Sequence, residues 1–356
     1  MHDNPLTLPL SSLRSHQAIV VEQRDWFADD ELRRALALAV AAGDKAQGTT
    51  SPNPPVGAAV VAVDGEIAGV GATQPVGGPH AEVMALRQAG AQAEGATMVV
   101  TLEPCAHTGR TGPCVDAIID AGIARVLYCQ KDPSALAAGG ASALEQAGVE
   151  TEYLGLAVKA LEPWLYAQQC NRPYVVVKIA QTADGFVAAA DGTSQWITGS
   201  AARQAGHRFR AQADAIMVGT GTVLADNPTL SARDAQGNEL AKQPRPIVVG
   251  TRSIPTESML WQRGVEQFSS PTKALEWLWD HGQRLVLVEG GPELITSMVQ
   301  ENLVDELHLY LAPLLLGAGK GSVGQLAGTL EHATRFYVEA TEMVGQDVAL
   351  VMRRAR

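Results

Sequence analysis

The chain has few cysteines, no excess of basic residues and no long apolar run. Its four cysteines, Cys105, Cys114, Cys129 and Cys170, are too few for a disulfide scaffold in 356 residues. Lys and Arg number 27 against 38 Asp and Glu, which argues against a broad nucleic-acid surface but allows local arginines to hold a small phosphorylated ligand. No run approaches the roughly 20 apolar residues of a membrane span, and an export pattern is absent. We therefore expect a cytoplasmic protein without nucleic-acid or membrane partners.

Length and composition indicate a globular protein with two domains. Hydrophobic residues make up 46% of the chain and charged residues 18%, which is typical of folded rather than disordered proteins. A chain of 356 residues exceeds what one hydrophobic core usually serves. We place the boundary in "KALEPWLYAQQCNRP", which predicts an N-terminal extension over 1–23, a first domain over 24–168 and a second over 169–356.

Helices and strands alternate in both predicted domains. In the first, "DDELRRALALAVAAG" indicates a helix, and two strand-like runs follow about an Asp64–Gly65 hairpin turn. "HAEVMALRQAG" indicates a second helix and "ATMVVTLEP" a buried strand. The second domain continues from "YVVVKIAQT" to "ELHLYLAPLLLG". This alternation predicts a layered α/β sheet in each half, predominantly parallel or mixed in the second.

One group of residues in the first half has the chemistry of an open zinc site. His80, Cys105 and Cys114 offer an imidazole and two thiolates, and three protein ligands leave a fourth position for water. Glu82, two residues from His80, is placed to move protons without being a ligand. A single cysteine is more often a small buried hydrophobe, and we assign no role to Cys129 or Cys170. The His-x-Glu start of a helix and the strand ending in Glu-Pro-Cys make the joint zinc interpretation the stronger one.

Two further segments near this group are candidates for substrate binding. Asn53 in "SPNPPVG" could hydrogen-bond a base or ribose, although ordinary turn chemistry explains it equally well. The eight residues between Cys105 and Cys114 include His107 and Arg110, which offer donors and a fixed cation to a polar ligand. The alternative for these two is a solvated loop.

The second half contains two glycine-rich turns after apolar strands. They lie in "LVLVEGGPELITSM" (285–298) and "VGTGTVLADNP" (218–228). If the strands are neighbours, both turns lie at one sheet edge, where a helix N-terminus can bind a pyrophosphate. Neither turn matches G-x-G-x-x-G, so tight turns without a ligand are the alternative. Arg210 and Arg233 could pair with a phosphate.

Taken together, these motifs resemble the bifunctional riboflavin-biosynthesis deaminase/reductase family. "SPNPPVG", "GPHAEVMAL", "TLEPCAHTGRTGPC" and "IIDAGIARV" resemble its deaminase domain, which is marked by a long Cys-x8-Cys loop. "KIAQTADG", "SQWIT", "RAQADAIMVGTGTVLADNPTL" and "VEGGPEL" resemble its reductase domain. The resemblance implies a cytidine-deaminase-like three-layer α/β/α domain followed by a dihydrofolate-reductase-like α/β domain.

The resemblance also implies two reactions and their cofactors. Zinc-dependent deamination of 2,5-diamino-6-ribosylamino-4(3H)-pyrimidinone 5′-phosphate would release ammonia. NADPH would then reduce the ribosyl group to ribityl, giving 5-amino-6-(5-phosphoribitylamino)uracil. The implied cofactors are one Zn²⁺ per deaminase domain and NADPH, and the implied partners are phosphorylated pyrimidines and further copies of the chain.

Site roles carry over position by position. His80, Cys105 and Cys114 match the zinc ligands and Glu82 matches the proton carrier. Positions that match NADP contacts are Ala180, Trp196, Thr222, Asp226, Gly291, Pro292, Glu293, Leu294, Ile295, Thr296 and Ser297. Positions that match substrate contacts in the reductase are Ser194, Arg210, Leu230, Arg233 and Glu289.

The chain departs from the family pattern at two places. Ser134 and Ala135 replace the usual Asn-Pro in "DPSALAAGGA", which questions the substrate contacts of the 132–141 loop. Gly250 replaces the usual Asp before Thr251 and Arg252, which we expect to hold the 2′-phosphate of NADPH.

Two other functions fit parts of the pattern. One is a deaminase of a different purine or pyrimidine fused to a reductase for a pterin-like substrate, against which the Cys-x8-Cys loop and the paired halves count. The other is a non-catalytic protein with a structural zinc site. Structural sites normally have four protein ligands, so three ligands beside Glu82 favour a catalytic site.

Overall fold

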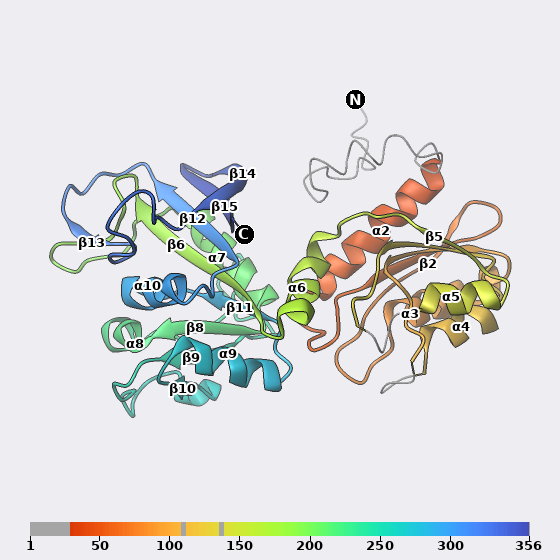
Figure 1. Cartoon of the computed structure of the whole chain (residues 1–356), viewed down its shortest axis with the longest axis horizontal. Helices are drawn as coiled ribbons and strands as arrows, with labels where there is room; N and C mark the ends of the chain where they lie inside the picture. The colour runs from red at the N-terminus through yellow and green to blue at the C-terminus, as the bar shows by residue number, and fades with distance from the viewer. Residues whose placement is uncertain (1–28, 108–111, 135–138, 356) are drawn as a thin grey trace. The chain divides into compact units, whose positions relative to one another are not determined.

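The computed structural model describes residues 29–107, 112–134 and 139–355, and it divides into two compact units. The first unit ends at Asn171 and the second begins at Arg172 (Figure 1). The sequence placed this boundary between residues 168 and 169. The division falls later because helix α6 (Glu162–Cys170) runs through that position and packs Trp164 into the first core. The N-terminal extension predicted over 1–23 lies outside the described residues.

The first unit contains a mixed five-stranded sheet in the order β2-β1-β3-β4-β5. β1 pairs antiparallel with both β2 and β3, whereas β3, β4 and β5 run parallel. The strands are β1 (Gly57–Val61), β2 (Ile67–Ala72), β3 (Thr97–Leu102), β4 (Arg125–Gln130) and β5 (Glu150–Tyr153). The helices are α2 (Asp30–Ala46), α3 (Ala81–Ala89), η3 (Gly90–Ala93), α4 (Cys114–Asp120), α5 (Gly140–Gln146), η4 (Lys159–Leu161) and α6.

Helices α2 and α3 pack on opposite faces of this sheet. A Cβ added to Gly57 on β1 would lie 1.8 Å from the Ala39 carbonyl oxygen of α2. One added to Gly71 on β2 would lie 2.2 Å from the Ala81 carbonyl oxygen of α3. Gly57 pairs with Ala72 and therefore faces away from Gly71, because successive strand residues alternate between the two faces. The expected three-layer α/β/α arrangement is thus confirmed.

The close approach of α2 to β1 predicts a large loss of stability for Gly57→Ala. The added methyl group has no space, so α2 must move away from the sheet, at an expected cost of about 3 kcal/mol or more. Chemical denaturation followed by circular dichroism measures this cost. Gly328→Ala is the control, because a Cβ there meets nothing within 4 Å. An unchanged unfolding midpoint for Gly57→Ala would contradict the packing described.

The second unit contains an eight-stranded sheet in the order β10-β9-β8-β11-β6-β12-β15-β14. The strands from β10 to β12 are parallel, and the last two are antiparallel, so the sheet is mixed as expected. They are β6 (Tyr174–Thr182), β8 (Ala215–Gly219), β9 (Arg245–Val249), β10 (Glu266–Phe268), β11 (Leu285–Val288), β12 (Glu306–Ala312), β14 (Phe336–Val344) and β15 (Asp347–Arg354). A separate pair is formed by β7 (Phe186–Ala189) and β13 (Gly319–Gly321).

Helices cover both faces of the second sheet. Residues of α9 and α10 pack in the main core with alternate residues of β6, whereas α7 packs on the other face with Tyr310 of β12. The helices are α7 (Ser200–Gln212), α8 (Thr220–Asp226), η5 (Trp261–Arg263), α9 (Pro271–Asp280) and α10 (Pro292–Gln300). Within residues 29–107, 112–134 and 139–355, no helix is long and apolar enough to cross a membrane.

Candidate active sites

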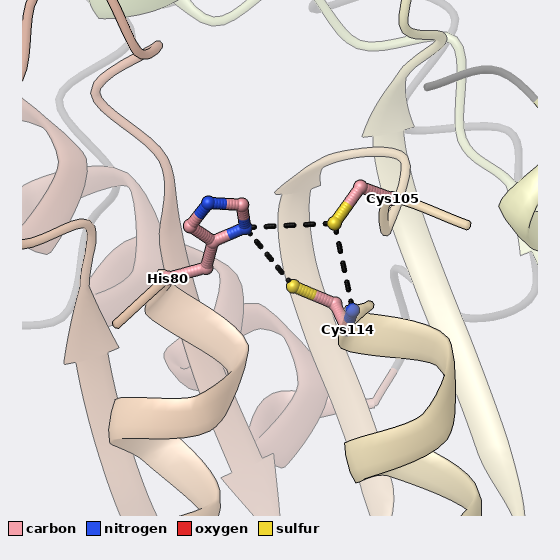
Figure 2. Close-up of side chains that lie close together, drawn as sticks. All are labelled: His80, Cys105 and Cys114. Atoms are coloured by element: carbon pink, nitrogen blue, oxygen red, sulfur yellow. Dashed lines mark hydrogen bonds between the residues drawn. The ribbon is translucent and has the colours of Figure 1, made fainter. Parts of the chain in front are cut away.

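Three metal-binding side chains meet in the first unit, each carried by a different segment. His80 is the N-cap of α3, Cys105 follows β3, and Cys114 is the first residue of α4 (Figure 2). His80 Nδ1 lies 3.2 Å from Cys114 Sγ and 3.5 Å from Cys105 Sγ. The Cys114 backbone N–H also donates to Cys105 Sγ over 3.4 Å. Cys114 therefore lies beside Cys105 in space, although eight residues separate the two cysteines in the chain.

The geometry of this cluster fits zinc. Its three ligand atoms all lie within 4.8 Å of one another. Zn–S bonds of ~2.3 Å and Zn–N bonds of ~2.0 Å at a tetrahedral angle require N···S separations of about 3.5 Å. The observed separations of 3.2 and 3.5 Å match that requirement. Two thiols and one imidazole are the donor set of an open zinc site with one position left for water or substrate.

Hydrogen bonds within the cluster shift the pKa values of its two thiols and its imidazole. A hydrogen bond from Cys114 lowers the pKa of the Cys105 thiol to about 4, and the pKa of Cys114 is correspondingly raised. Hydrogen bonding to Cys105 raises the pKa of His80. Glu82 lies in the first turn of α3 with only 4% of its surface exposed, and burial raises its pKa, followed by the negative charge of Cys105. A buried carboxyl group thus lies against the ligands.

The start of α5, which follows the segment that departs from the family pattern, is hydrogen-bonded to Glu103, for which the sequence suggested no role. The buried Glu103 carboxylate accepts hydrogen bonds from the Gly139 and Ala141 backbone N–H groups over 3.3 and 3.2 Å. A Cβ on Gly140 would lie 1.7 Å from the Pro104 carbonyl oxygen, so the chain approaches the Glu-Pro-Cys segment closely there. In the sequence, the position of Glu103 directly before Pro104 and Cys105 could have indicated a role at this site.

The other predicted residues of this site are brought together only in part. Asn53 is half-buried, and its backbone closes a turn in which Thr50 Oγ1 donates to the Asn53 carbonyl oxygen over 3.0 Å. His107 is exposed, and its charge acts on the carboxyl group of Asp132, whose pKa is raised mainly by burial. Arg110 lies outside the described residues. Asp132 therefore joins the candidates, at the start of the altered loop.

In the second unit, the two glycine-rich turns follow neighbouring strands. β8 and β11 pair in parallel, so the N-termini of α8 and α10 lie at the same sheet edge (Figure 1). A Cβ added to Gly291, the N-cap of α10, would come no nearer than 3.8 Å to Thr222 Oγ1. The backbone at this edge is thus open to a ligand, which fits a dinucleotide pyrophosphate at a helix N-terminus.

The remaining positions matched to NADP contacts differ in whether their side chains are buried, hydrogen-bonded or exposed. Leu294 and Ile295 are buried in the core, so their backbone is all they can present. Thr296 Oγ1 donates to the Pro292 carbonyl oxygen, and Ser297 Oγ donates to Glu301 Oε1. Exposed side chains are found at Asp226 and Glu293, whereas Ala180 is half-buried on β6.

Trp196 lies on the segment between β7 and α7 with 68% of its surface exposed. The Arg203 guanidinium lies 4.4 Å from its ring centroid, within the range of a cation–π interaction. Ser194, two residues earlier, is also exposed. The segment with Ser194 and Trp196 therefore lies at the surface, and Arg203 of α7 contacts it through the Trp196 ring.

A cluster of half-buried charges lies beside α7. Arg210 donates from Nε and Nη2 to both oxygens of Glu289, each over 2.8 Å, and from Nη1 to the Ser231 carbonyl oxygen over 3.0 Å. Burial alone would raise the pKa of Glu289, but the charge and hydrogen bonds of Arg210 outweigh it and hold that pKa at about 2. Burial lowers the pKa of Lys178 on β6, and the charge of Glu289 opposes this. His207 Nδ1 lies 3.2 Å from the same Ser231 oxygen.

Sequence reasoning missed both Lys178 and His207. The available signal for Lys178 was a single lysine inside the apolar strand "YVVVKIAQT". For His207 it was the helical spacing of Arg203, His207 and Arg210, which puts all three on one face of α7.

The loop after α8 brings the other predicted substrate contacts to this cluster. Leu230 is buried and has a positive φ of 52°, and Ser231 follows it. The side-chain amide of Gln243 accepts from the Ala232 N–H over 2.8 Å and donates to the Ala232 carbonyl oxygen over 2.9 Å. Arg233 is half-buried and pairs with the more exposed Glu239 over 2.8 Å.

Comparisons with known proteins agree with these two sites. Residues 29–130 match the cytidine and deoxycytidylate deaminase zinc-binding region, and residues 173–350 match the RibD C-terminal domain. The riboflavin biosynthesis protein RibD of Corynebacterium ammoniagenes is 49% identical over 88% of this chain and 96% of its own length.

Two solved structures are similar along most of the chain. Acinetobacter baumannii RibD has a TM-score of 0.83 and 34% identity, covering 90% of this chain and 98% of that one. A diaminohydroxyphosphoribosylaminopyrimidine deaminase/5-amino-6-(5-phosphoribosylamino)uracil reductase from Thermotoga maritima has a TM-score of 0.77 and 30% identity, covering 89% and 97%. With a deaminase unit suited to zinc and a reductase unit suited to NADPH, the chain belongs to the RibD family of bifunctional deaminase–reductases of riboflavin biosynthesis.

Proposed function

We propose that the two units catalyse consecutive steps on one phosphorylated pyrimidine. The first converts 2,5-diamino-6-ribosylamino-4(3H)-pyrimidinone 5′-phosphate to 5-amino-6-(5-phosphoribosylamino)uracil and ammonia. The second reduces that product to 5-amino-6-(5-phosphoribitylamino)uracil. The activities for which the Thermotoga maritima relative is named support these substrates. The observation that carries the proposal is the three-ligand His80, Cys105 and Cys114 cluster with a buried carboxyl group beside it.

In the deaminase unit, His80, Cys105 and Cys114 would hold zinc and Glu82 would move protons. Zinc supplies a Lewis-acidic centre at which water becomes a nucleophile near neutral pH. Glu82 accepts a proton from the attacking water and delivers it to the departing amino group, because its carboxyl group is buried against the ligands and shielded from solvent. Asn53, His107 and Arg110 remain our proposed contacts to the substrate, and Asp132 joins them.

In the reductase unit, Lys178 and the Arg210–Glu289 pair would receive the sugar. NADPH supplies a hydride to the carbonyl carbon of the ring-opened ribosyl group. Lys178 donates a hydrogen bond to the carbonyl oxygen and a proton as that oxygen gains charge, since it is a half-buried cation beside the fixed pair. Arg210 and Glu289 hold each other in place and orient the sugar hydroxyls.

We assign the substrate phosphate to Arg233, and Ser194 and Leu230 remain our proposed contacts to the substrate. Arg210 already has hydrogen bonds to Glu289 and Ser231 from three of its nitrogens. Arg233 also donates from three nitrogens, to Ser231 Oγ, the Gly237 carbonyl oxygen and Glu239 Oε1, but its charged partner Glu239 has a side chain that is 51% exposed. Such an exposed pair contributes only ~0–1 kcal/mol, so a phosphate dianion can replace Glu239.

The cofactor would lie along the edge formed by the ends of β8, β9 and β11. The open backbone at Gly291 takes the pyrophosphate, with Thr222 beside it, and Trp196 and Asp226 remain our proposed contacts to the cofactor. Arg252 follows β9 and is exposed, and a Cβ on Gly221 would lie 3.1 Å from its Nη2. An exposed cation beside the first turn of α8 supports a contact between Arg252 and the 2′-phosphate.

Arg252→Ala is expected to lower the preference for NADPH over NADH by about tenfold to a hundredfold. The reason is the loss of charge-assisted hydrogen bonds to the 2′-phosphate, a group that NADH lacks. The ratio of kcat/KM for the two dinucleotides measures this preference. Arg335→Ala, at an exposed arginine of the same unit, is the control. An unchanged ratio in Arg252→Ala would refute the assignment.

We also propose that the chain assembles with copies of itself and works in the cytoplasm. The edge strand β14 supports assembly, because Tyr337, Val338 and Met343 are 50, 55 and 64% exposed on it. Unpaired edge strands with apolar side chains favour pairing with another chain. A monomeric mass in light scattering would contradict this assembly. The four unpaired cysteines agree with a reducing compartment.

Mass spectrometry of the diaminopyrimidinone ribosyl phosphate after incubation with the zinc-loaded chain tests the proposed function. Without NADPH, we expect one amino group to be exchanged for oxygen. With NADPH, we expect the further gain of two hydrogens. Deamination alone would refute the reductase assignment, and an unchanged substrate in both samples would refute the deaminase assignment.

A further inference from the structure

The first residue of β15 makes a contact that joins two distant parts of the reductase unit. Asp347 follows the turn between β14 and β15 and is only 2% exposed. Its Oδ2 accepts a hydrogen bond over 2.7 Å from the backbone N–H of Gly199, 148 positions earlier in the chain. A buried carboxylate is costly unless it is hydrogen-bonded, so this contact fixes both partners.

Gly199 is the N-cap of α7, and it has no side chain with which to cap that helix. The Asp347 carboxylate supplies a negative charge there from another segment, where the helix dipole favours it. The two segments are closely packed, since a Cβ on Gly199 would lie 3.3 Å from Asp347 Oδ2. One on Gly345 would lie 3.3 Å from the Ala201 Cβ. Asp347 therefore sets where α7 begins.

The start of α7 in turn holds the exposed Trp196. Arg203, in the first turns of the helix, donates from Nη1 to the Thr198 carbonyl oxygen over 2.9 Å. The same guanidinium lies 4.4 Å from the centre of the Trp196 ring. Because Trp196 is 68% exposed, these contacts, and not burial in the core, determine its position.

We infer that Asp347 is a positioning residue for NADPH, which it orients by fixing Gly199 and, through Arg203, the Trp196 segment. The inference rests on the proposed function, in which Trp196 contacts the cofactor. Arg210 lies roughly 16 Å further along α7 at 1.5 Å per residue, and Glu289 anchors it separately. Asp347 thus acts on the start of α7 and on the Trp196 segment, which also carries the proposed substrate contact Ser194, and it leaves Arg210 in place.

Titration of NADPH fluorescence with the full-length, zinc-loaded protein tests this inference. Asp347→Ala removes the acceptor, and we expect the Kd for NADPH to rise roughly tenfold. Asp347→Asn keeps an oxygen acceptor without the charge and should give an intermediate Kd. Gln346→Ala, at the exposed neighbour in the same turn, should bind as the wild type does. In steady-state assays, the KM for the pyrimidine should rise by less than the Kd for NADPH does in Asp347→Ala, because Arg210, Arg233 and Glu289 stay in place.

Two results would overturn the inference. One is an unchanged Kd for NADPH in Asp347→Ala. The other is an equal weakening of NADPH and pyrimidine binding, which would show a general loss of folding in the reductase unit. Ammonia release without NADPH provides an internal control, since it depends on the other unit. Failure of the proposed function would appear differently, as a wild-type protein that does not reduce the uracil intermediate.

Discussion

Glu82→Gln should abolish deamination while the protein keeps its zinc and its reductase activity. The amide is nearly the same size as the carboxyl group, but it cannot accept a proton from water or deliver one to the leaving amine. General acid–base catalysis contributes about 10²- to 10⁴-fold, so ammonia release should fall by at least a hundredfold. Ammonia release, bound zinc by atomic absorption, and NADPH oxidation with the deaminated intermediate measure the three properties.

The control for this variant is Glu94→Gln, at an exposed glutamate of the same unit. It should release ammonia at the wild-type rate. If Glu82→Gln lost zinc together with activity, Glu82 would be needed to maintain the metal cluster and its assignment as proton carrier would be wrong. Undiminished ammonia release would contradict the assignment directly.

Lys178→Met should abolish NADPH-dependent reduction and leave deamination intact. Methionine fills much of the space of the lysine stem, but it cannot donate to the sugar carbonyl oxygen or protonate it. Removing a general acid lowers rates by about 10²-fold or more. Arg210 and Glu289 still pair in the variant, so the half-buried Glu289 carboxylate keeps its partner. NADPH oxidation with the deaminated intermediate measures the loss, and Lys273→Met, at an exposed lysine of α9, is the control.

The pH dependence of the wild-type reductase adds a second readout of Lys178. Its role requires the protonated ammonium, which predominates below its pKa. Burial lowers that pKa, the charge of Glu289 raises it and the charge of Arg210 lowers it further. The rate should therefore decline with rising pH below the ordinary lysine value of ~10.5, and the residual rate of Lys178→Met should lack this decline. A reductase rate in Lys178→Met within about twofold of wild type would refute the role.

The zinc cluster could be predicted from sequence because its ligands lie at the ends of local elements. A helix start at His80, a strand end before Cys105 and a helix start at Cys114 are each marked by nearby proline or glycine. In a layered sheet such ends meet at one edge. The eight residues between the two cysteines do not separate them in space, because the Cys114 N–H donates a hydrogen bond to Cys105 Sγ.

The cluster of half-buried charges in the reductase unit was harder to anticipate. Arg210 and Glu289 were assigned as separate substrate contacts, and only the folded chain shows that they pair across 79 positions. Lys178 is found beside them because β6 pairs with β12, which sets the face of the sheet that each residue occupies. A shift of one residue in that register would move Lys178 to the opposite face.

The sequence by itself determined the fold class, the order of the two units and the family, because these depend on local periodicity and on short motifs. It also indicated the glycine-rich turns, but not that β8 and β11 are neighbours, since β9 and β10 lie between them in the chain. Tertiary structure alone decided the Arg210–Glu289 pairing, the position of Lys178 and the contact between Asp347 and Gly199. These depend on strand order and register, which are set by long-range packing and leave no local pattern in the sequence.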